Sequence, residues 1–319
     1  MDLLDKIFVA PFRDMVDLPD ILVQTLWEGF VAGILYALIA LGFVLIYRSS
    51  RIFNFAQGVM VVFASLAMIW FNQKGIPAWI ALALALVVML VMAIAIERIV
   101  LRPLIGQPDI ILFMATIGIT LVLIGIGEWW FGGENQAMIT DKLGVPGEQW
   151  DLRILGGRVS IRQQDVAAVI VAILLVAGLL VFLNRSQMGR AIRALSDDAQ
   201  AALSVGISLH QIWVLVWFLA GVIALVTGIA WGARVDITFN LQVIAYKALP
   251  VLMLGGLDSI SGAIVGGLLI GILEKLFEIY WAQPIMGGGS ETWFAFVLAL
   301  IVLLFRPQGL FGEKIIERV

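Results

Sequence analysis

The sequence contains no cysteine and only one histidine, His210. The lack of cysteine excludes disulfides, thiolate metal sites and cysteine nucleophiles. A single histidine leaves no imidazole cluster for a metal ion, and a histidine in a loop is not expected to complete a Ser-His-Asp triad. We interpret His210 as a loop residue at the start of a helix. The composition therefore excludes cysteine-based metal sites, histidine-cluster metal sites and cysteine nucleophiles.

Charged residues are also scarce. They make up 13% of the 319 residues, whereas 62% are hydrophobic and the mean hydropathy is +1.04. Soluble domains carry about 25% charged residues. The composition therefore predicts an all-α integral membrane protein, and we treat residues 1–319 as one transmembrane domain. The first residues lack the positive region and the cleavage pattern of a secretory signal, so we expect none to be removed.

Nine apolar segments are candidates to cross the membrane, because about 20 apolar residues span the hydrocarbon core. In chain order they are Gly29 to Tyr47, Ile52 to Gln73, Ala78 to Ile96, Ile110 to Gly127, Val166 to Leu183, Ile212 to Ala233, Phe239 to Leu257, Ile260 to Leu273 and Thr292 to Phe305. Residues 1–28 are acidic and are expected to form an interfacial segment. Residues 132–165 are polar and glycine-rich, which suggests an outside loop or hairpin.

Lysine and arginine next to membrane spans mark the cytoplasmic side. With an outside N-terminus and nine crossings, every basic cluster falls inside. These clusters are Arg48/Arg51, Arg98/Arg102, Arg185/Arg190/Arg193 and Arg306/Lys314/Arg318. A re-entrant Phe239 to Leu257 would move the basic C-terminus outside. We therefore expect this segment to cross as a broken helix, with the C-terminus in the cytoplasm.

The polar stretch 185–211 is expected to be a cytoplasmic loop that holds a short helix. We predict Asp197 as its N-cap, Gln200 as the capping-box partner and Gly206 as its C-terminal stop. One small apolar stripe follows helical spacing along the stretch: Ile192, Leu195, Ala199, Ala202 and Gly206. Such a surface is suited to docking against another protein, and an ordinary solvated loop is the alternative.

Two interrupted segments place polar groups and helix breakers at membrane depth. They contain Asn54, Gln57 and Gly58 in the first half, and Lys247, Pro250, Gly255 and Gly256 in the second. Transporters often build substrate sites from paired broken helices in inverted repeats, an arrangement that these segments permit. We predict the substrate pathway here, with Thr116 as a weaker candidate. The alternative is that the amides bond to neighbouring helices. Lys247 is able to attract a carboxylate or to mark an interface.

Several sequence blocks together resemble the permease subunit of the branched-chain amino acid ABC importer family, and they occur in the order found in that family. They are Asn54 to Gly58, Thr116 to Gly118, Met188 to Ala194, Ala201-Ala202 with Gly206-Ile207, Lys247-Ala248, Leu254 to Ala263 and Arg306 to Phe311. The chain departs from the family at Arg51, where glycine is common, and at Ser261, where proline is common. Gln200-Ala201-Ala202 with Gly206 resembles the Glu-Ala-Ala-x-x-x-Gly coupling loop of ABC importer permeases, with Gln200 in place of the acidic residue and without the later proline of that motif.

The resemblance implies a transport subunit in a bacterial or archaeal cell membrane that hydrolyses nothing itself and holds no cofactor. Its implied partners are a homologous second permease or a second copy, two cytoplasmic ATPase subunits that bind ATP and Mg, and a periplasmic or lipid-anchored solute-binding protein. The segment that would couple ATPase closure to the spans contains Arg190, Arg193, Asp197, Gln200, Ala201, Ala202 and Gly206.

Other readings stay open at this point. Similar permeases serve urea, short amides or small carboxylates as well as amino acids. An ion-driven secondary transporter is a second class, but it usually needs buried acidic residues, and we expect Asp and Glu only near the edges of spans. An intramembrane enzyme would need a nucleophile with a base, and no such set converges in the sequence.

Overall fold

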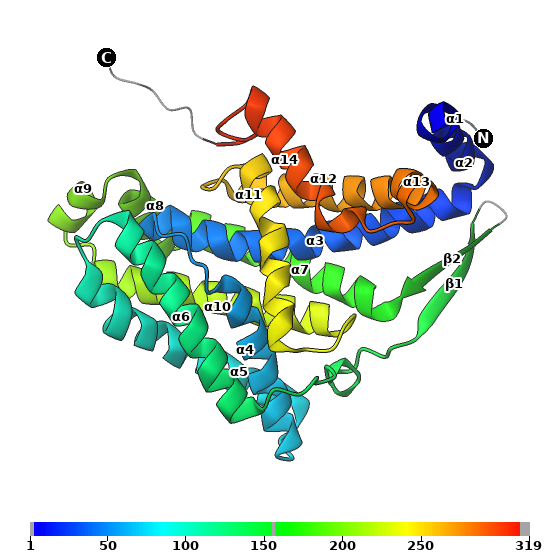
Figure 1. Cartoon of the computed structure of the whole chain (residues 1–319). Helices are drawn as coiled ribbons and strands as arrows, with labels where there is room; N and C mark the ends of the chain where they lie inside the picture. The colour runs from blue at the N-terminus through cyan, green and yellow to red at the C-terminus, as the bar shows by residue number, and fades with distance from the viewer. Residues whose placement is uncertain (1–2, 155–156, 313–319) are drawn as a thin grey trace. The chain divides into compact units, whose positions relative to one another are not determined.

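The computed structural model describes residues 3–154 and 157–312, and it is built almost entirely of helices (Figure 1). The chain divides into two compact units. Unit 1 comprises Met1–Ala37, Val145–Val169 and Lys247–Val319, and unit 2 comprises Leu38–Gly144 and Ile170–Tyr246. The basic residues Lys314 and Arg318 of the C-terminal cluster lie outside the described residues.

The helices of the first half of the chain are α1 (Leu3–Phe8), α2 (Ala10–Asp17), α3 (Pro19–Ser50), α4 (Gln57–Gln73), α5 (Ala78–Ala95), η1 (Ile96–Leu101), η2 (Arg102–Leu104), α6 (Asp109–Phe131) and η3 (Thr140–Leu143). A hairpin of β1 (Gln149–Ile154) and β2 (Gly157–Arg162) follows. The second half contains α7 (Gln163–Arg185), α8 (Gln187–Asp197), α9 (Ala199–Ser204), α10 (Leu209–Gly232), η4 (Phe239–Lys247), α11 (Ala248–Gly255), α12 (Ile260–Phe277), η5 (Glu278–Ala282), α13 (Gln283–Met286), η6 (Ser290–Thr292) and α14 (Phe294–Phe305).

Within the described part of the chain, six helices are long and apolar enough to cross a membrane. They are Pro19–Ser50, Ala78–Leu104, Asp109–Phe131, Gln163–Arg185, Leu209–Gly232 and Ile260–Met286. The other three expected spans correspond to shorter apolar helices, Gln57–Gln73, Phe239–Gly255 and Phe294–Phe305. The 17-residue α4 is about 25 Å long at 1.5 Å per residue, less than the ~30 Å hydrocarbon core.

The first long helix begins ten residues before the expected span. Pro19 starts α3, in a position where proline suits the first helical turn, and Asp20 lies in that turn, where a negative charge is favourable. Gln24 then donates to Glu28 over 2.7 Å, one helical turn apart. These polar residues therefore extend the helix, and only α1 and α2 precede it as separate helices.

The second expected span begins later than Ile52, because residues 51–54 are not helical. Arg51 has a φ of 55°, a left-handed conformation that glycine adopts with less strain. The side chain of Asn54 accepts a hydrogen bond from the backbone N–H of Ala56 at 3.1 Å, which supports a turn. The chain thus leaves α3, turns, and enters α4 only at Gln57.

Residues 149–162 form the hairpin expected in the polar stretch. The strands pair antiparallel, from Gln149 opposite Arg162 to Ile154 opposite Gly157. Val159 is fully buried, and the backbone N–H of Ser160 donates to the side chain of Gln24 at 2.9 Å. The hairpin is therefore fastened to the first part of α3, within unit 1.

Glycines allow close helix packing in unit 1. A Cβ on Gly267 would lie 2.8 Å from the carbonyl oxygen of Gly33, and one on Gly271 would overlap the backbone of Gly33. Only helices without side chains at these positions approach so closely. Unit 1 also contains the contacts of α11 with α12 and α14.

The core of unit 2 is formed by α4, α5 and α10, and α6 also packs against α4. Trp217 of α10 is 1% exposed, and Met60 of α4 is fully buried. A Cβ on Gly228 would come within 2.6 Å of the Val61 carbonyl oxygen, so α10 and α4 are in close contact there.

Candidate functional site

The turn before α4 and the middle of α6 are joined by Thr116. Its hydroxyl oxygen lies 3.1 Å from the carbonyl oxygen of Phe53 and 2.8 Å from that of Phe113, so its single proton is shared between these two acceptors, and it accepts from the N–H of Phe55 at 3.2 Å. Thr116 is fully buried. The structure therefore brings this predicted pathway residue directly against the turn that contains Asn54.

Asn54 and Gln57 are fully buried and bonded to protein groups. The amide of Asn54 lies 3.4 Å from the Gln57 oxygen, and Gln57 donates to the carbonyl oxygen of Ala220 in α10 at 3.4 Å. Gly58 faces η4, because a Cβ there would lie 2.6 Å from the Cβ of Ala245 and 2.7 Å from the carbonyl oxygen of Gln242. These residues thus hold α4 against α10 and η4.

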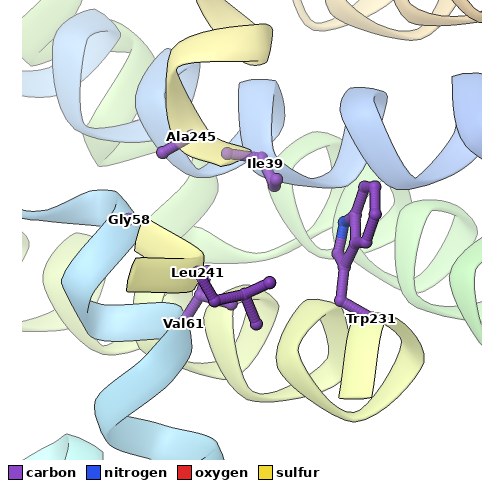
Figure 2. A pocket seen from close by; sticks show the side chains of 6 residues that line it. All are labelled: Ile39, Gly58, Val61, Trp231, Leu241 and Ala245. Atoms are coloured by element: carbon purple, nitrogen blue, oxygen red, sulfur yellow. The ribbon is translucent and has the colours of Figure 1, made fainter. Parts of the chain in front are cut away.

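A small hollow lies beside Gly58 in unit 2 (Figure 2). It is lined by Ile39, Gly58, Val61, Trp231, Leu241 and Ala245. Its volume is about 10 Å³, room for roughly one water molecule. Apolar side chains dominate the lining, so the hollow offers little to hold a charged group.

Lys247 makes a partly buried ion pair with Glu274 in unit 1. Its ammonium lies 2.9 Å from Oε1 of Glu274 and 3.1 Å from the hydroxyl of Tyr36, and the Tyr36 hydroxyl lies 3.0 Å from the same Glu274 oxygen. Glu274 is 1% exposed and lies in the middle of the helix Ile260–Met286. The expectation that acidic residues occur only near the edges of spans is therefore wrong. The helix extends well past Leu273, where the apolar run in the sequence ends.

Gly255 and Gly256 end the broken segment. Gly255 approaches Gly262 backbone to backbone, and Gly256 has a φ of 103°, which a side chain would strain. The N–H of Leu310 donates to the Leu254 carbonyl oxygen at 2.8 Å. These two predicted pathway residues therefore lie where α11 meets α12 and the segment after α14, in unit 1.

The polar stretch 185–211 contains two helices instead of one. Ser186 caps α8 by accepting from the N–H of Gly189 at 2.8 Å. Arg193 donates to the carbonyl oxygen of Leu183 and, at 3.4 Å, to Asn184. Arg190 donates to the carbonyl oxygen of Arg185 at 3.4 Å. Both arginines thus bind the C-terminal end of α7, where positive charge is favourable.

The second helix, α9, is capped by Asp198, not Asp197. Asp198 has an extended backbone and accepts from the N–H groups of Gln200 at 2.9 Å and Ala201 at 3.0 Å. Asp197 is the last residue of α8, so it cannot act as the N-cap of the next helix. The predicted capping box with Gln200 is absent from the hydrogen bonds of this described segment, where Gln200 bonds through its backbone.

Gly206 stops α9 as predicted, with a φ of 87° and its N–H donating to the Leu203 carbonyl oxygen at 3.1 Å. The predicted single apolar stripe is wrong, because the chain breaks its helical path at Asp198. Ile192 and Leu195 are buried on α8, and Ala202 is buried on α9. Asp197, Gln200, Ala201 and Gly206 are exposed, and Arg190 is also exposed.

Sequence reasoning missed several residues. Leu203 and Val205 are 47% and 77% exposed on and just after α9, although both are apolar. His210 starts α10 as expected, but its Nδ1 also lies 2.6 Å from Oε1 of Glu97. Tyr36 and Glu274 gave no local signal as partners of Lys247. The available clue was a pair of opposite charges: Glu274 directly follows one apolar run, and Lys247 lies within another.

The six long apolar helices, which include the glycine-packed pair α3 and α12, together with the shorter apolar segment broken at Lys247, define a multi-pass helical membrane protein. A profile of the family described as branched-chain amino acid transport system / permease component matches residues 25–305. Since this match covers most of the sequence, the chain belongs to that family of transport permeases.

Individual relatives agree with this assignment. The chain is 30% identical over 307 residues to the high-affinity branched-chain amino acid transport system permease protein BraD of Pseudomonas aeruginosa, covering 93% of this chain and 97% of that protein. It is 29% identical over 311 residues to the permease protein LivH of Escherichia coli, with the same coverage, 93% and 97%. It is also 27% identical over 286 residues to the fructose import permease protein FruF of Bifidobacterium longum, covering 86% and 75%.

Proposed function

We propose that this chain is the permease subunit of an ABC importer that moves branched-chain amino acids or related small polar solutes inward. Hydrolysis of ATP, bound with Mg on partner ATPase subunits, would drive the transport. The observation that carries the proposal is the family match along residues 25–305, which includes both interrupted segments and the α8–α9 stretch. The chain itself would be a transport subunit and not an enzyme.

The proposed topology has nine crossings, with the three short apolar helices as broken or tilted spans. An outside N-terminus then places the basic clusters, from Arg48 to Arg306, on the cytoplasmic side. The hairpin β1–β2 falls outside, and α8–α9 falls inside. The two interrupted segments would correspond in an inverted repeat, the arrangement that many transporters use. The location would be the cell membrane of a bacterium or archaeon.

The α8–α9 stretch is proposed to bind an ATPase subunit. Arg190 and Arg193 bind α8 to the end of α7 by hydrogen bonds. A displacement of α8 would therefore be transmitted directly to that span. The exposed apolar side chains Leu203 and Val205 are the groups whose burial would favour docking. Coupling requires an element whose position both partners bias, and α8–α9 with α7 and α10 fits that requirement.

The pathway residues are proposed to act as two groups. One group is the turn before α4, with Asn54, Gln57, Gly58 and Thr116, and the other contains Lys247, Gly255 and Gly256. The hydrogen bonds of Thr116 and Gln57 give the first group a defined shape. The broken helix around Lys247 gives the second group a charged side chain.

The substrate is proposed to be an amino acid with a branched apolar side chain, delivered by a periplasmic or lipid-anchored binding protein. The relatives BraD and LivH are named for such substrates, and FruF is named for fructose. Permeases for urea, amides or small carboxylates are therefore the alternative within the family. The permease partner would be a homologous chain or a second copy of this one.

An ion-driven secondary transporter remains the candidate from another class, because buried Glu274 is the kind of residue that such proteins use as a relay. The two mechanisms differ in their source of energy. An ion gradient alone would drive the second, and ATP with a binding protein would drive the first.

The deciding experiment is purification of the chain co-expressed with its genomic neighbours, followed by ATP hydrolysis in liposomes with and without the binding protein and candidate ligands. Stimulation by a liganded binding protein is expected, and the ligand that stimulates would name the substrate. Copurification without ATPase, together with transport under an imposed ion gradient alone, would overturn the importer proposal.

A further inference from the structure

The ion pair of Lys247 and Glu274, with Tyr36, forms a buried polar cluster inside unit 1. A single oxygen, Oε1 of Glu274, is shared by the Lys247 ammonium at 2.9 Å and the Tyr36 hydroxyl at 3.0 Å. The ammonium also lies 5.4 Å from the centre of the Tyr36 ring. The cluster is thus compact, and its two formal charges cancel.

All three residues lie near the middle of apolar helices, namely Pro19–Ser50, Phe239–Gly255 and Ile260–Met286. A buried ion pair is expensive to desolvate, and apolar residues of similar size often give equal or greater stability. Ionisable groups inside spans are therefore functional candidates by default. The position of Lys247 strengthens the case, because it lies where η4 changes into α11.

Lys247 and Glu274 each have hydrogen-bonding capacity that the contacts within the cluster do not use. An ammonium has three donors, and Glu274 and Tyr36 account for two of those of Lys247. The side chain of Lys247 is 25% exposed, whereas that of Glu274 is 1% exposed. The second oxygen of Glu274, Oε2, is buried and has no hydrogen-bond partner within the described residues. Each charge therefore has one polar position left for a ligand.

We infer that this cluster binds the charged groups of a zwitterionic amino acid, with Lys247 receiving the carboxylate and Oε2 of Glu274 receiving the ammonium. This inference rests on the proposed importer function and selects its substrate class. Tyr36 is a positioning residue that holds Oε1 of Glu274. Because Oε2 is buried, this binding mode requires the side chains around it to move so that the ligand's ammonium reaches it.

The charge balance selects between substrate classes. A zwitterion added to a neutral ion pair leaves a neutral complex, so no uncompensated charge remains in a low-dielectric site. A carboxylate without an amino group would leave a net negative charge. Urea and simple amides carry no charge, and an ion pair gives them no advantage over neutral hydrogen-bonding groups. The cluster therefore favours amino acids over the other solutes of similar permeases.

The first test uses the complete reconstituted complex with its ATPases and binding protein. Lys247→Met combined with Glu274→Leu removes both charges and leaves none unpaired. We expect this double variant to keep ATP hydrolysis stimulated by the binding protein, while amino acid uptake per ATP falls about tenfold or more. Lys247→Arg, which keeps the charge, is expected to retain most uptake. Normal uptake per ATP in the double variant would overturn the inference and make the pair structural.

The second test needs no charge substitution. Tyr246 directly precedes Lys247 and is 48% exposed. The chain has no cysteine, so Tyr246→Cys creates one unique thiol in this chain. In a complex with cysteine-free partners, its reaction with a small methanethiosulfonate is measured. Leucine in excess should slow the reaction about fivefold. The carboxylic acid that lacks leucine's amino group should not slow it, and neither should urea. A rate unchanged by leucine, or slowed equally by the deaminated acid, would overturn the inference.

Gly133→Cys is the matched control, since Gly133 is exposed with open space around it. Its reaction should be indifferent to all three solutes. The two proposals fail in distinguishable ways. Absence of ATP hydrolysis stimulated by a binding protein in the native complex would remove the importer function. The thiol protection would still report whether an amino acid occupies the cluster.

Discussion

The imidazole Nδ1 of His210 lies 2.6 Å from Oε1 of Glu97, and this contact joins the first turn of α10 to the π-helical segment η1. Glu97 is 5% exposed, and His210 is a hydrogen-bond partner of its carboxylate in unit 2. Since α10 directly follows α9, the pair ties the end of the proposed coupling stretch to the helix Ala78–Leu104.

We therefore expect Glu97→Ala to loosen this end of α10. The free energy of unfolding should fall by about 1 kcal/mol. The loss is small because the His210 side chain is 40% exposed and can hydrogen-bond to water in the variant. The apparent melting temperature of the purified protein should fall by a few degrees. Glu128→Ala, at an exposed position, is the control and should leave it unchanged. Equal effects of both substitutions would contradict the assigned role of the pair.

Arg193 and Arg190 offer a matched comparison on one helix. Arg193→Ala removes the bonds to Leu183 and Asn184, whereas Arg190→Ala removes one 3.4 Å bond from an exposed side chain. We expect uptake to fall about tenfold for Arg193 and less than about twofold for Arg190, because weak exposed contacts contribute little. Uptake in vesicles with equal amounts of inserted protein measures both. Similar losses would show that the α7 contact does not determine coupling.

Gly206 adopts a φ of 87° after α9. Gly206→Ala should cost about 1–2 kcal/mol, because a Cβ is disfavoured in this region. Gly206→Asn should cost less, since asparagine tolerates left-handed conformations. Uptake should follow the order glycine, asparagine, alanine while membrane insertion stays intact. Gly133→Ala is the control at an open position. Full uptake by Gly206→Ala would remove this turn from the mechanism.

Thr116 satisfies the N–H of Phe55 and the carbonyl oxygen of Phe53 in a fully buried position. Thr116→Val keeps the shape but leaves both backbone groups without this partner, at about 1–3 kcal/mol per group. Thr116→Ser should restore most of the stability, which thermal unfolding in detergent can measure. A valine variant as stable as the native protein would mean that the turn finds other partners.

Asn54→Ala and Gln57→Ala test the pathway itself. If the amides contact the solute, uptake kinetics should change by about tenfold while the stability changes by about 1 kcal/mol. Concentration-dependent uptake separates the two effects. Unchanged kinetics in both variants would identify the amides as packing groups, the role for which Gln57 has a visible partner in Ala220.

Much of the fold could be predicted from local sequence. Each of the nine apolar segments corresponds to an apolar helix, and the hairpin occurs in the polar stretch expected to hold one. Helix ends were predicted less well. Polar residues such as Gln24 and Glu28 do not end a helix, and either of the adjacent residues Asp197 and Asp198 could cap α9 by composition alone.

Local sequence is enough to establish the class of this protein, because low charge and long apolar runs leave only a membrane protein, and ordered blocks such as Asn54 to Gly58 identify the family. Which polar residues meet depends on how the helices pack in the folded chain. Lys247 and Tyr36 are 211 positions apart, and Thr116 is 61 positions from Phe55. No periodicity links such residues, since their contact depends on how helices pack, and burial then makes each polar group require the partner that packing brings to it.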